Sequence, residues 1–353
     1  MEKYVFGIDL GGTTVKLGLL SVEGELLDKW EIPTNTANGG ATILQDIAAA
    51  LRGKLNEKGI EEDEVLGAGM GVPGAVLEDR YVKPCVNLNG WGGDVAGALS
   101  DLCGFPVKAA NDANAAALGE MWRGGGEGCE NVVFVTLGTG VGGGIIVEGK
   151  LLSGVHGAAG ELGHIKVNTA ETECCGCGKK GCLEQYASAT GIVREANRLL
   201  KASDAPSALR ALEKVTAKDV FDYAKQGDAM AKDVVSFFGE TLGRALSIVS
   251  CVCDPEVFVI GGGVSAAGQV ILDVVAFFGE TLGRALAIVS CVCDPEVFVI
   301  GGGVSAAGQV ILDVVADAFV RNAFPASEGT RFTLAKLGND AGVYGAARLI
   351  LGA

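Results

Sequence analysis

The chain has little basic charge and few aromatic side chains. It contains 28 lysines and arginines against 43 aspartates and glutamates, which gives a formal net charge of −15 over 353 residues. This balance argues against a nucleic acid or an anionic membrane as the partner, because both attract positively charged surfaces. Aromatic residues make up 6% of the chain while glycine occurs 55 times, which favours a loop-rich α/β protein over a coiled coil or a disordered chain. At this length we expect two domains.

Targeting signals and long apolar runs are also missing. Residues 1–9 enter an expected strand at once, without the charged start, apolar centre and cleavage site of a signal peptide. No apolar stretch reaches the length of a membrane span without a glycine or an aspartate. Eleven cysteines would suit a secreted protein, but four cluster as metal ligands do and four more lie in a repeated segment. We therefore predict a reduced, cytoplasmic setting.

Histidine occurs only twice, and His164 lies just upstream of the cysteine cluster Cys175, Cys177 and Cys182. Three thiols at Cys-x-Cys-x4-Cys spacing, with glycines in the turns, and one imidazole supply four ligands for a tetrahedral zinc ion. A closed Cys3His set leaves no position for water, so the pattern predicts a structural zinc. His156 has no matching spacing and is expected to be an ordinary loop residue.

Two carboxylates, Glu161 and Glu184, flank these ligands. As isolated residues they would be solvated surface acids. A bound metal would rigidify the backbone that carries them and hold them in a fixed relation to His164, whose second ring nitrogen faces a further partner or a substrate hydroxyl. The segment is therefore a candidate polar binding site built on loops.

Two stretches, residues 4–27 and 131–152, share the plan of a strand, a glycine-rich turn and a second strand. In the first turn, Gly11 and Gly12 let backbone N–H groups approach phosphate oxygens, and the two following threonines add hydroxyl donors. Asp9 at the strand end is suited to a magnesium–water cluster beside those phosphates. An ordinary hairpin turn is the alternative, but a similar turn at residues 138–140 favours a nucleotide, which needs donors from two domains.

Asp112 follows an expected strand at residues 106–109 and begins an alanine-rich helix. A carboxylate at this position commonly caps the helix, a role worth about 1 kcal/mol. It also fits the general base of phosphoryl transfer, which takes a proton from a substrate hydroxyl. The residue alone leaves both interpretations open, with the cap favoured.

Residues 237–276 and 277–316 are one 40-residue unit present twice, differing only at Ser247 and Ala287. Two copies are too few for a solenoid, so we interpret the unit as a tandem duplication within a domain that needs one copy. The sequence of each copy predicts a helix and a strand, followed by a run of three glycines and a second predicted helix. Glycines after a strand and before a helix bring backbone close to a ligand. We expect the second strand, Val297–Ile300, to enter the sheet, because its glycines lead into the helix that continues towards the C-terminus.

Together these residues resemble the ROK family of sugar kinases and repressors, and within it the bacterial ATP-dependent glucokinases of the Gram-positive type. The resemblance covers the chain apart from one 40-residue copy. It is carried by residues 9–14, 111–114, 137–144, 160–164, 175–184 and 338–346.

The resemblance implies an α/β, actin-like or hexokinase-type (ribonuclease H-like) fold of two domains with a cleft between them, usually as a homodimer. The expected small domain comprises residues 1–110 and the C-terminal helix 339–353. The expected large domain comprises residues 111–338 and includes the zinc loop and the duplicated segment.

The resemblance also implies the activity: ATP and Mg²⁺-dependent phosphorylation of glucose at the 6-hydroxyl, with Asp112 as general base. The implied sugar-binding residues are Gly74, Asn87, Asn111, Glu161, His164 and Glu184, with Asn89 as a near alternative to Asn87. The implied structural zinc ligands are His164, Cys175, Cys177 and Cys182. The implied nucleotide-binding residues are Asp9, Gly11, Gly12, Thr13, Thr14, Lys16, Gly138, Thr139, Gly140, Gly301, Gly302 and Gly303.

Four alternatives remain open at this point. In the first, the substrate is another hexose, such as N-acetylmannosamine or fructose. In the second, polyphosphate replaces ATP as the phosphoryl donor. In the third, the duplication leaves a folded but inactive sugar-binding protein. The fourth is a sugar-responsive repressor, which would need an N-terminal helix-turn-helix where this chain has its phosphate-binding hairpin from residue 4. The acidic balance also argues against the repressor.

Overall fold

The computed structural model describes residues 3–85, 88–253, 255–263, 297–300, 331–334, 337 and 340–351. The chain divides into two compact units. The first comprises Met1–Glu130, Gly144–Gly160 and Asn339–Ala353, and the second Asn131–Gly143 and Glu161–Gly338. This division puts residues 111–130 and 144–160 in the first unit, whereas we expected the large domain to begin at residue 111.

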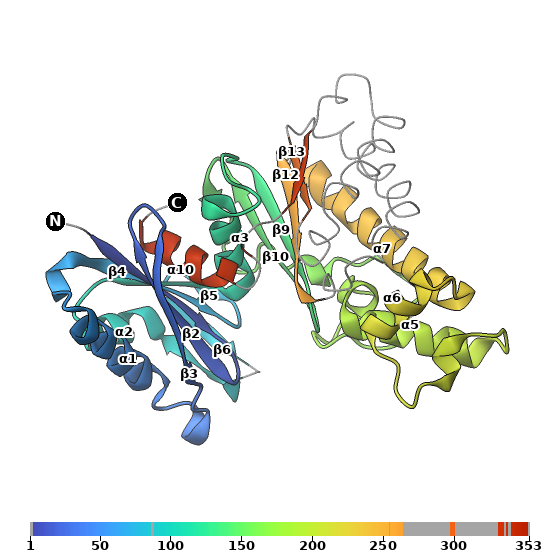
Figure 1. Ribbon diagram of the computed structural model, residues 1–353, viewed down its shortest axis with the longest axis horizontal. Coiled ribbons are helices and arrows are strands. Elements are labelled where there is room, and N and C mark those ends of the chain that lie inside the picture. Colours follow the sequence, from blue (N-terminus) through green and yellow to red (C-terminus); the bar gives the residue numbers. More distant parts are fainter. Residues whose placement is uncertain are drawn as a thin grey trace. The chain divides into compact units, whose positions relative to one another are not determined.

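The first unit, where Figure 1 labels β2, β3 and β4, contains a five-stranded sheet in the order β3-β2-β1-β4-β8. Its strands are β1 (Tyr4–Leu10), β2 (Thr14–Ser21), β3 (Leu26–Pro33), β4 (Val65–Val72) and β8 (Val107–Asn111). Strands β1, β2 and β3 are antiparallel neighbours, while β4 runs parallel to β1 and β8 runs parallel to β4. The strand–turn–strand predicted around the first glycine-rich turn is confirmed. A smaller sheet contains β5 (Val76–Leu77), β6 (Tyr81–Cys85) and β7 (Trp91–Asp94).

Helices cover both faces of the five-stranded sheet, as alternation along β1 requires. Phe6 and Ile8 of β1 join a core cluster with residues of α1 (Ile43–Lys58) and α2 (Val95–Cys103). Val5, which points to the opposite face, packs with Val343 and Ala347 of α10 (Ala341–Leu351). Helix α3 (Asp112–Arg123) lies against α10.

Glycines allow α10 to lie directly on its neighbours. A Cβ atom on Gly69 of β4 would overlap the carbonyl of Ala346, and one on Gly345 would overlap the carbonyl of Ala115 in α3. Any side chain at these positions would push the helix away from the sheet or from α3.

A four-stranded sheet has the order β11-β10-β9-β12. Its strands are β9 (Val132–Leu137), β10 (Val141–Val147), β11 (Lys150–Leu151) and β12 (Val257–Gly261). Among its described residues, the second unit contains the α-helices α4 (Glu184–Ala187), α5 (Ala189–Ala202), α6 (Ala217–Lys225) and α7 (Ala229–Cys253). Phe221 of α6 packs edge to face on Phe238 of α7, with ring centroids 6.0 Å apart. Among the described residues, no helix combines the length and the apolar character needed to cross a membrane.

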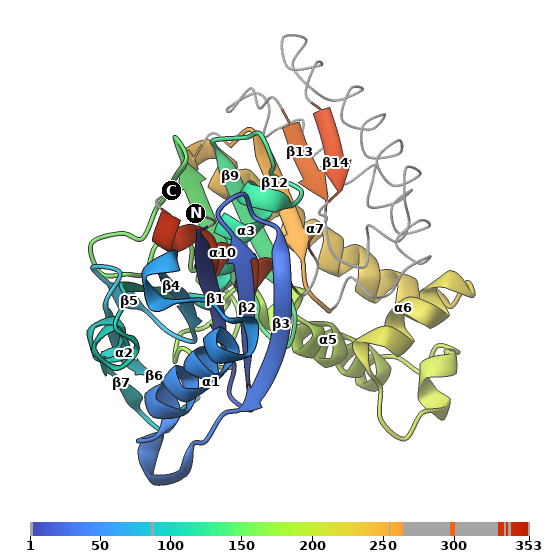
Figure 2. The same cartoon turned by 60° about the vertical axis from the view of Figure 1, so that its left-hand side comes forward.

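Both copies of the repeat contribute a strand. Strand β12, from the first copy, runs parallel to β9, and all five of its residues are buried. Strand β13 (Val297–Ile300), from the second copy, lies beside β12 and pairs in parallel with β14 (Arg331–Leu334) (Figure 2). Our expectation that the second copy provides the strand beside β9 is wrong. The first copy takes that place because α7 runs unbroken from Ala229 into the repeat and leads directly to β12.

Candidate functional site

The four predicted zinc ligands come together in the second unit. The ligand atoms of His164, Cys175, Cys177 and Cys182 all lie within 4.8 Å of one another. The sulfurs of Cys177 and Cys182 are 3.7 Å apart, and that of Cys175 is 3.9 Å from Nδ1 of His164. Tetrahedral zinc, with Zn–S bonds of about 2.3 Å and Zn–N bonds of about 2.0 Å, separates its ligand atoms by roughly 3.5–3.8 Å. The donor set therefore fits zinc in both chemistry and size.

The backbone around these ligands forms a tight loop, which we call the cysteine loop, residues 165–183. The N–H of Cys175 donates to the carbonyl of Lys179, and Gly178 turns back to the carbonyl of Cys175 in a left-handed conformation, with φ of 79°. Burial raises the pKa of the Cys182 thiol to about 12. A metal that binds this thiol therefore displaces a proton.

His164 turns its two ring nitrogens to different partners. Nδ1 faces Cys175, and Nε2 lies 3.9 Å from a carboxylate oxygen of Glu161. Metal-bound histidines commonly present their second nitrogen to a carboxylate or another polar group. The prediction that His164 serves a metal and a second partner at once matches this geometry.

Glu184 joins the cysteine loop to the second glycine-rich turn. One of its carboxylate oxygens lies 3.5 Å from the sulfur of Cys175, and the other accepts the backbone N–H of Val141 at 3.1 Å. A Cβ atom on Gly140 would collide with this carboxylate, so a side chain there would push the end of Glu184 aside. The turn is closed by the N–H of Gly138, which donates to the carbonyl of Gly140 at 3.0 Å.

Helix α5 supports the same turn from its N-terminus. The N–H of Ala189 donates to the carbonyl of Gly138 at 2.8 Å, and the hydroxyl of Thr190 donates to the carbonyl of Thr139 at 3.0 Å. Ser188 caps the helix by accepting the N–H of Gly191. The turn, the helix and the cysteine loop therefore form one hydrogen-bonded assembly.

A brace that we did not predict ties the cysteine loop to α5. Arg194 of α5 pairs with Glu171 at 2.6 Å and with Glu173 at 3.1 Å, and Tyr186 donates its hydroxyl to Glu171. Burial alone would raise the pKa of Glu171, but the hydrogen bonds from Tyr186, Glu173 N–H and Arg194 bring it down to about 2. Nothing in the spacing of these residues along the chain marks them as partners.

The first unit brings together Gly74, Asn111 and Asp112. Asn111 is the N-cap of α3, and its side-chain oxygen accepts the N–H groups of Ala113 and Asn114 at 3.0 and 3.3 Å. Its side-chain nitrogen donates to the carbonyl of Gly74 at 3.2 Å. Asp112 is exposed at the first helical position, and its carboxylate accepts the N–H of its neighbour Ala113 at 2.8 Å. The capping role that we weighed for Asp112 thus belongs to Asn111.

The first glycine-rich turn connects β1 to β2. The N–H of Gly11 donates to the carbonyl of Thr14 at 3.0 Å, which leaves Gly12 and Thr13 exposed at the tip. Asp9 at the end of β1 lies 3.4 Å from the ammonium group of Lys16. The phosphate-binding residues predicted in the first strand–turn–strand segment therefore share one end of a hairpin.

Some predicted residues lie outside the described part of the chain, namely Asn87, Gly301, Gly302 and Gly303. The corresponding glycines of the first copy are described in part. Gly262, with φ of 100°, packs against the backbone of Leu137, the residue before the turn 138–140. The turn 138–140 is therefore approached by a glycine of the first copy, whereas the sequence prediction named the glycines of the second copy.

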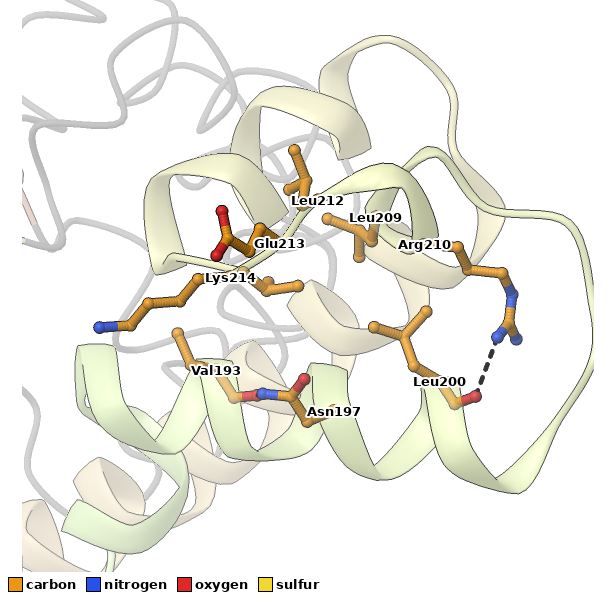
Figure 3. A pocket seen from close by; sticks show the side chains of 9 residues that line it. Val193, Asn197, Leu200, Leu209, Arg210, Leu212, Glu213 and Lys214 are labelled. Atoms are coloured by element: carbon orange, nitrogen blue, oxygen red, sulfur yellow. Dashed lines mark hydrogen bonds between the residues drawn. The ribbon is translucent and has the colours of Figure 1, made fainter.

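Pockets lined by described residues of the second unit include the following two. One, of about 230 Å³, is bordered by the cysteine loop, the turn 138–140 and the start of α5, and includes Thr139, Cys175, Glu184 and Arg194. The other, of about 410 Å³, lies between α5 and residues 209–215, with Val193, Leu200 and Leu209 on its walls (Figure 3). It contains none of the predicted site residues.

An α/β fold of this topology, with two glycine-rich turns and a Cys3His cluster beside paired acids, defines the class of actin-like sugar kinases and their relatives. The chain belongs to the ROK family, whose model matches residues 5–276 and 269–353. It is 39% identical to the glucokinase of Halalkalibacterium halodurans over 354 residues, 99% of this chain and 95% of that protein.

Solved structures agree with this assignment. The ROK hexokinase from Thermus thermophilus superposes with a TM-score of 0.71 at 28% identity, covering 98% of this chain and 96% of that one. A ROK family glucokinase from Streptomyces griseus, in complex with glucose and AMPPNP, gives a TM-score of 0.65 at 30% identity and covers 98% of both chains. The expected hexokinase-type fold is confirmed.

Proposed function

We propose that this protein is an ATP-dependent glucokinase that phosphorylates glucose at the 6-hydroxyl. The observation that carries the proposal is the 39% identity with a glucokinase over 99% of this chain and 95% of that enzyme. The donor set and turns described above are consistent with this chemistry, because phosphoryl transfer needs positioned phosphates, a positioned hydroxyl and one base.

Asp112 is the proposed general base. It accepts the proton of the sugar 6-hydroxyl while that oxygen bonds to the γ-phosphorus and the bond to the ADP oxygen breaks. Two features support this role: Asp112 is exposed at the start of α3, and Asn111 already caps the helix.

The proposed sugar-binding residues are Gly74, Asn87, Asn111, Glu161, His164 and Glu184. Glu161 and Glu184 are suited to accept hydrogen bonds from sugar hydroxyls, and His164 can donate from Nε2 when Nδ1 binds a metal. The carbonyl of Gly74 is oriented by Asn111. Carboxylates that accept bonds from a sugar discriminate strongly against analogues that lack the hydroxyl.

The nucleotide phosphates are proposed to bind the two glycine-rich turns, with Asp9 near the Mg²⁺ ion that accompanies the phosphates. Bound Mg²⁺ would neutralise phosphate charge, and bound Zn²⁺ at the Cys3His cluster would hold the cysteine loop, and with it Glu184, in place. A homodimer stays a prediction.

A coupled assay tests the proposal. Purified protein with ATP and Mg²⁺ is offered glucose, fructose, mannose, N-acetylglucosamine and N-acetylmannosamine, and glucose is also offered with polyphosphate. We expect the highest kcat/KM for glucose with ATP. A higher kcat/KM for an N-acetylated sugar would assign the enzyme a different hexose, and sugar binding without any turnover would assign it a binding role.

A further inference from the structure

The two copies of the repeat are sequence equivalents at a place in the fold that holds only one of them. Strand β12 is paired with β9 from Val257↔Val132 to Gly261↔Thr136, and residues 297–301 repeat the same Val-Phe-Val-Ile-Gly. Residues 297–301 therefore carry the same backbone and side-chain groups as β12 and could make the same contacts with β9.

The equivalence continues through the preceding helix. Residues 233–253 of α7 and residues 273–293 differ only at Ser236 against Ala276 and at Ser247 against Ala287. Phe237 and Phe238 of α7 pack on Tyr186 and Phe221, and the same two residue types recur in the sequence at positions 277 and 278. A family model that matches residues 5–276 and again 269–353 shows the same redundancy, since its two pieces meet inside the repeat.

We propose that the domain has two alternative threadings: residues 233–261 or residues 273–301 form the helix and strand beside β9. In the second threading, residues 233–272 become the insertion between α6 and the helix. The loop-closure entropy changes only slowly with insertion length, so chain connectivity does not forbid the exchange.

The first turn of α7 decides which threading dominates. Met230 and Ala231 are buried, with exposures of 5% and 0%, and the second threading puts Val270 and Ile271 in their place. A larger side chain at a fully buried alanine overpacks the core. We therefore infer that the first threading, which the structure adopts, is the major state and that the second is a minor state that a local defect in copy one makes dominant.

A matched set of variants tests the exchange. Val259 of β12 is fully buried, and Val259→Asp places a carboxylate in the core. In a chain lacking residues 277–316, this change should abolish soluble folded protein, because no spare copy exists. In the full chain, the same change should leave a folded protein whose kinase activity is within about threefold of the parent, since the second copy supplies an intact strand. The double change Val259→Asp and Val299→Asp in the full chain should again abolish folding.

Hydrogen exchange measured by mass spectrometry gives a direct readout that does not depend on activity. Peptides covering Ser247 and Ala287 differ in mass by one oxygen atom, so the two copies can be followed separately. Compared with the parent, full-length Val259→Asp should lose protection in the Ser247 peptide and gain it in the Ala287 peptide. If full-length Val259→Asp is as insoluble as its single-copy counterpart, or folds with protection unchanged in both peptides, the second threading does not exist. Failure of the parent to phosphorylate glucose would overturn the proposed function but not this inference.

Discussion

We assign adjacent residues at the start of α3 to separate tasks, Asn111 as the observed cap and Asp112 as the proposed base. The side chain of Asn111 satisfies two N–H groups of the first turn and also holds the carbonyl of Gly74. Asp112 stands at the first helical position, where the positive end of the helix favours a negative charge. Because the cap does not depend on Asp112, a change there should reveal catalysis rather than stability.

Asp112→Asn should reduce kcat for glucose phosphorylation by about 10²–10⁴-fold, the usual contribution of a general base. Glucose affinity and melting temperature should stay close to those of the parent, because the amide keeps the size of the carboxylate and Asn111 keeps the cap. Steady-state kinetics, glucose titration calorimetry and thermal unfolding measure the three quantities. A lowered melting temperature with kcat intact would return Asp112 to a structural role.

Glu171 is the residue whose charge should matter most for the cysteine loop at low pH. Its side chain is 11% exposed and its pKa is lowered from 4.5 to about 2. A lowered carboxyl pKa stabilises the fold fully above the unfolded value of 4.5, and this stabilisation is lost as pH falls towards 2.

Glu171→Gln should lower the free energy of unfolding at pH 7 by on the order of 1–3 kcal/mol, and the difference from the parent should shrink as pH falls from 5 to 2. Urea unfolding at several pH values measures this. The matched control is Glu173→Gln, which changes the other carboxylate on Arg194; that side chain is 70% exposed. The control should cost less than about 1 kcal/mol, as exposed ion pairs do. Equal effects of the two changes would contradict the assignment.

At the scale of elements, the turn 138–140, the cysteine loop and α5 depend on one another through Glu184. Local patterns in the sequence predicted the turn and the cysteine cluster, since glycines and cysteines are local signals, but they did not predict α5. The contacts that join them were not predictable. Val141 N–H to Glu184 and Arg194 to Glu171 connect residues 43 and 23 positions apart, and only the packed backbone determines such pairs.

Gly140→Ala tests the link between the turn and Glu184. The new methyl group would displace the Glu184 carboxylate, so we expect KM for glucose to rise about tenfold or more, as expected when a hydrogen-bonding carboxylate is misplaced. Gly176→Ala is the control: it lies in the cysteine loop, has no atom within 4 Å of its added Cβ and is not in a left-handed conformation. An unchanged KM in Gly140→Ala would separate Glu184 from the sugar.

Removal of the metal tests the cysteine loop as an element. We expect about one zinc per chain, the stoichiometry of a single Cys3His site, to be released by a chelator. Glucose affinity should fall before ATP affinity, because His164 and Glu184 lie directly on either side of the loop, while the turn 138–140 is also held by α5. Metal analysis with parallel glucose and nucleotide titrations measures the order. Loss of both affinities together would show that the metal holds more than the loop.

For the whole molecule, the sequence sufficed to predict the family, the class of fold and the first hairpin, because these depend on motifs and periodicity. It did not settle how the duplicated segment fits the sheet. Identical sequences carry identical local preferences, so neither Val257 nor Val297 is marked as the residue opposite Val132. The decision rests on what precedes each copy: α7 is continuous with the first and buries Met230 and Ala231.

Deleting either copy should give nearly the same protein, since chains lacking residues 237–276 or 277–316 differ only in Ser or Ala at position 247. In either chain the single remaining strand can pair with β9 on one side and with β14 on the other, as β13 now does from Val297↔Arg331 to Ile300↔Leu334.

We expect equal melting temperatures and equal kcat/KM in the two deletion variants. Their stability should be at least that of the parent, because the ordering of a surplus segment is no longer needed. Ser247→Ala in the parent controls for the single difference. If both deletions fail to fold while the parent folds, β13 is an integral strand of the sheet and the repeat is not surplus.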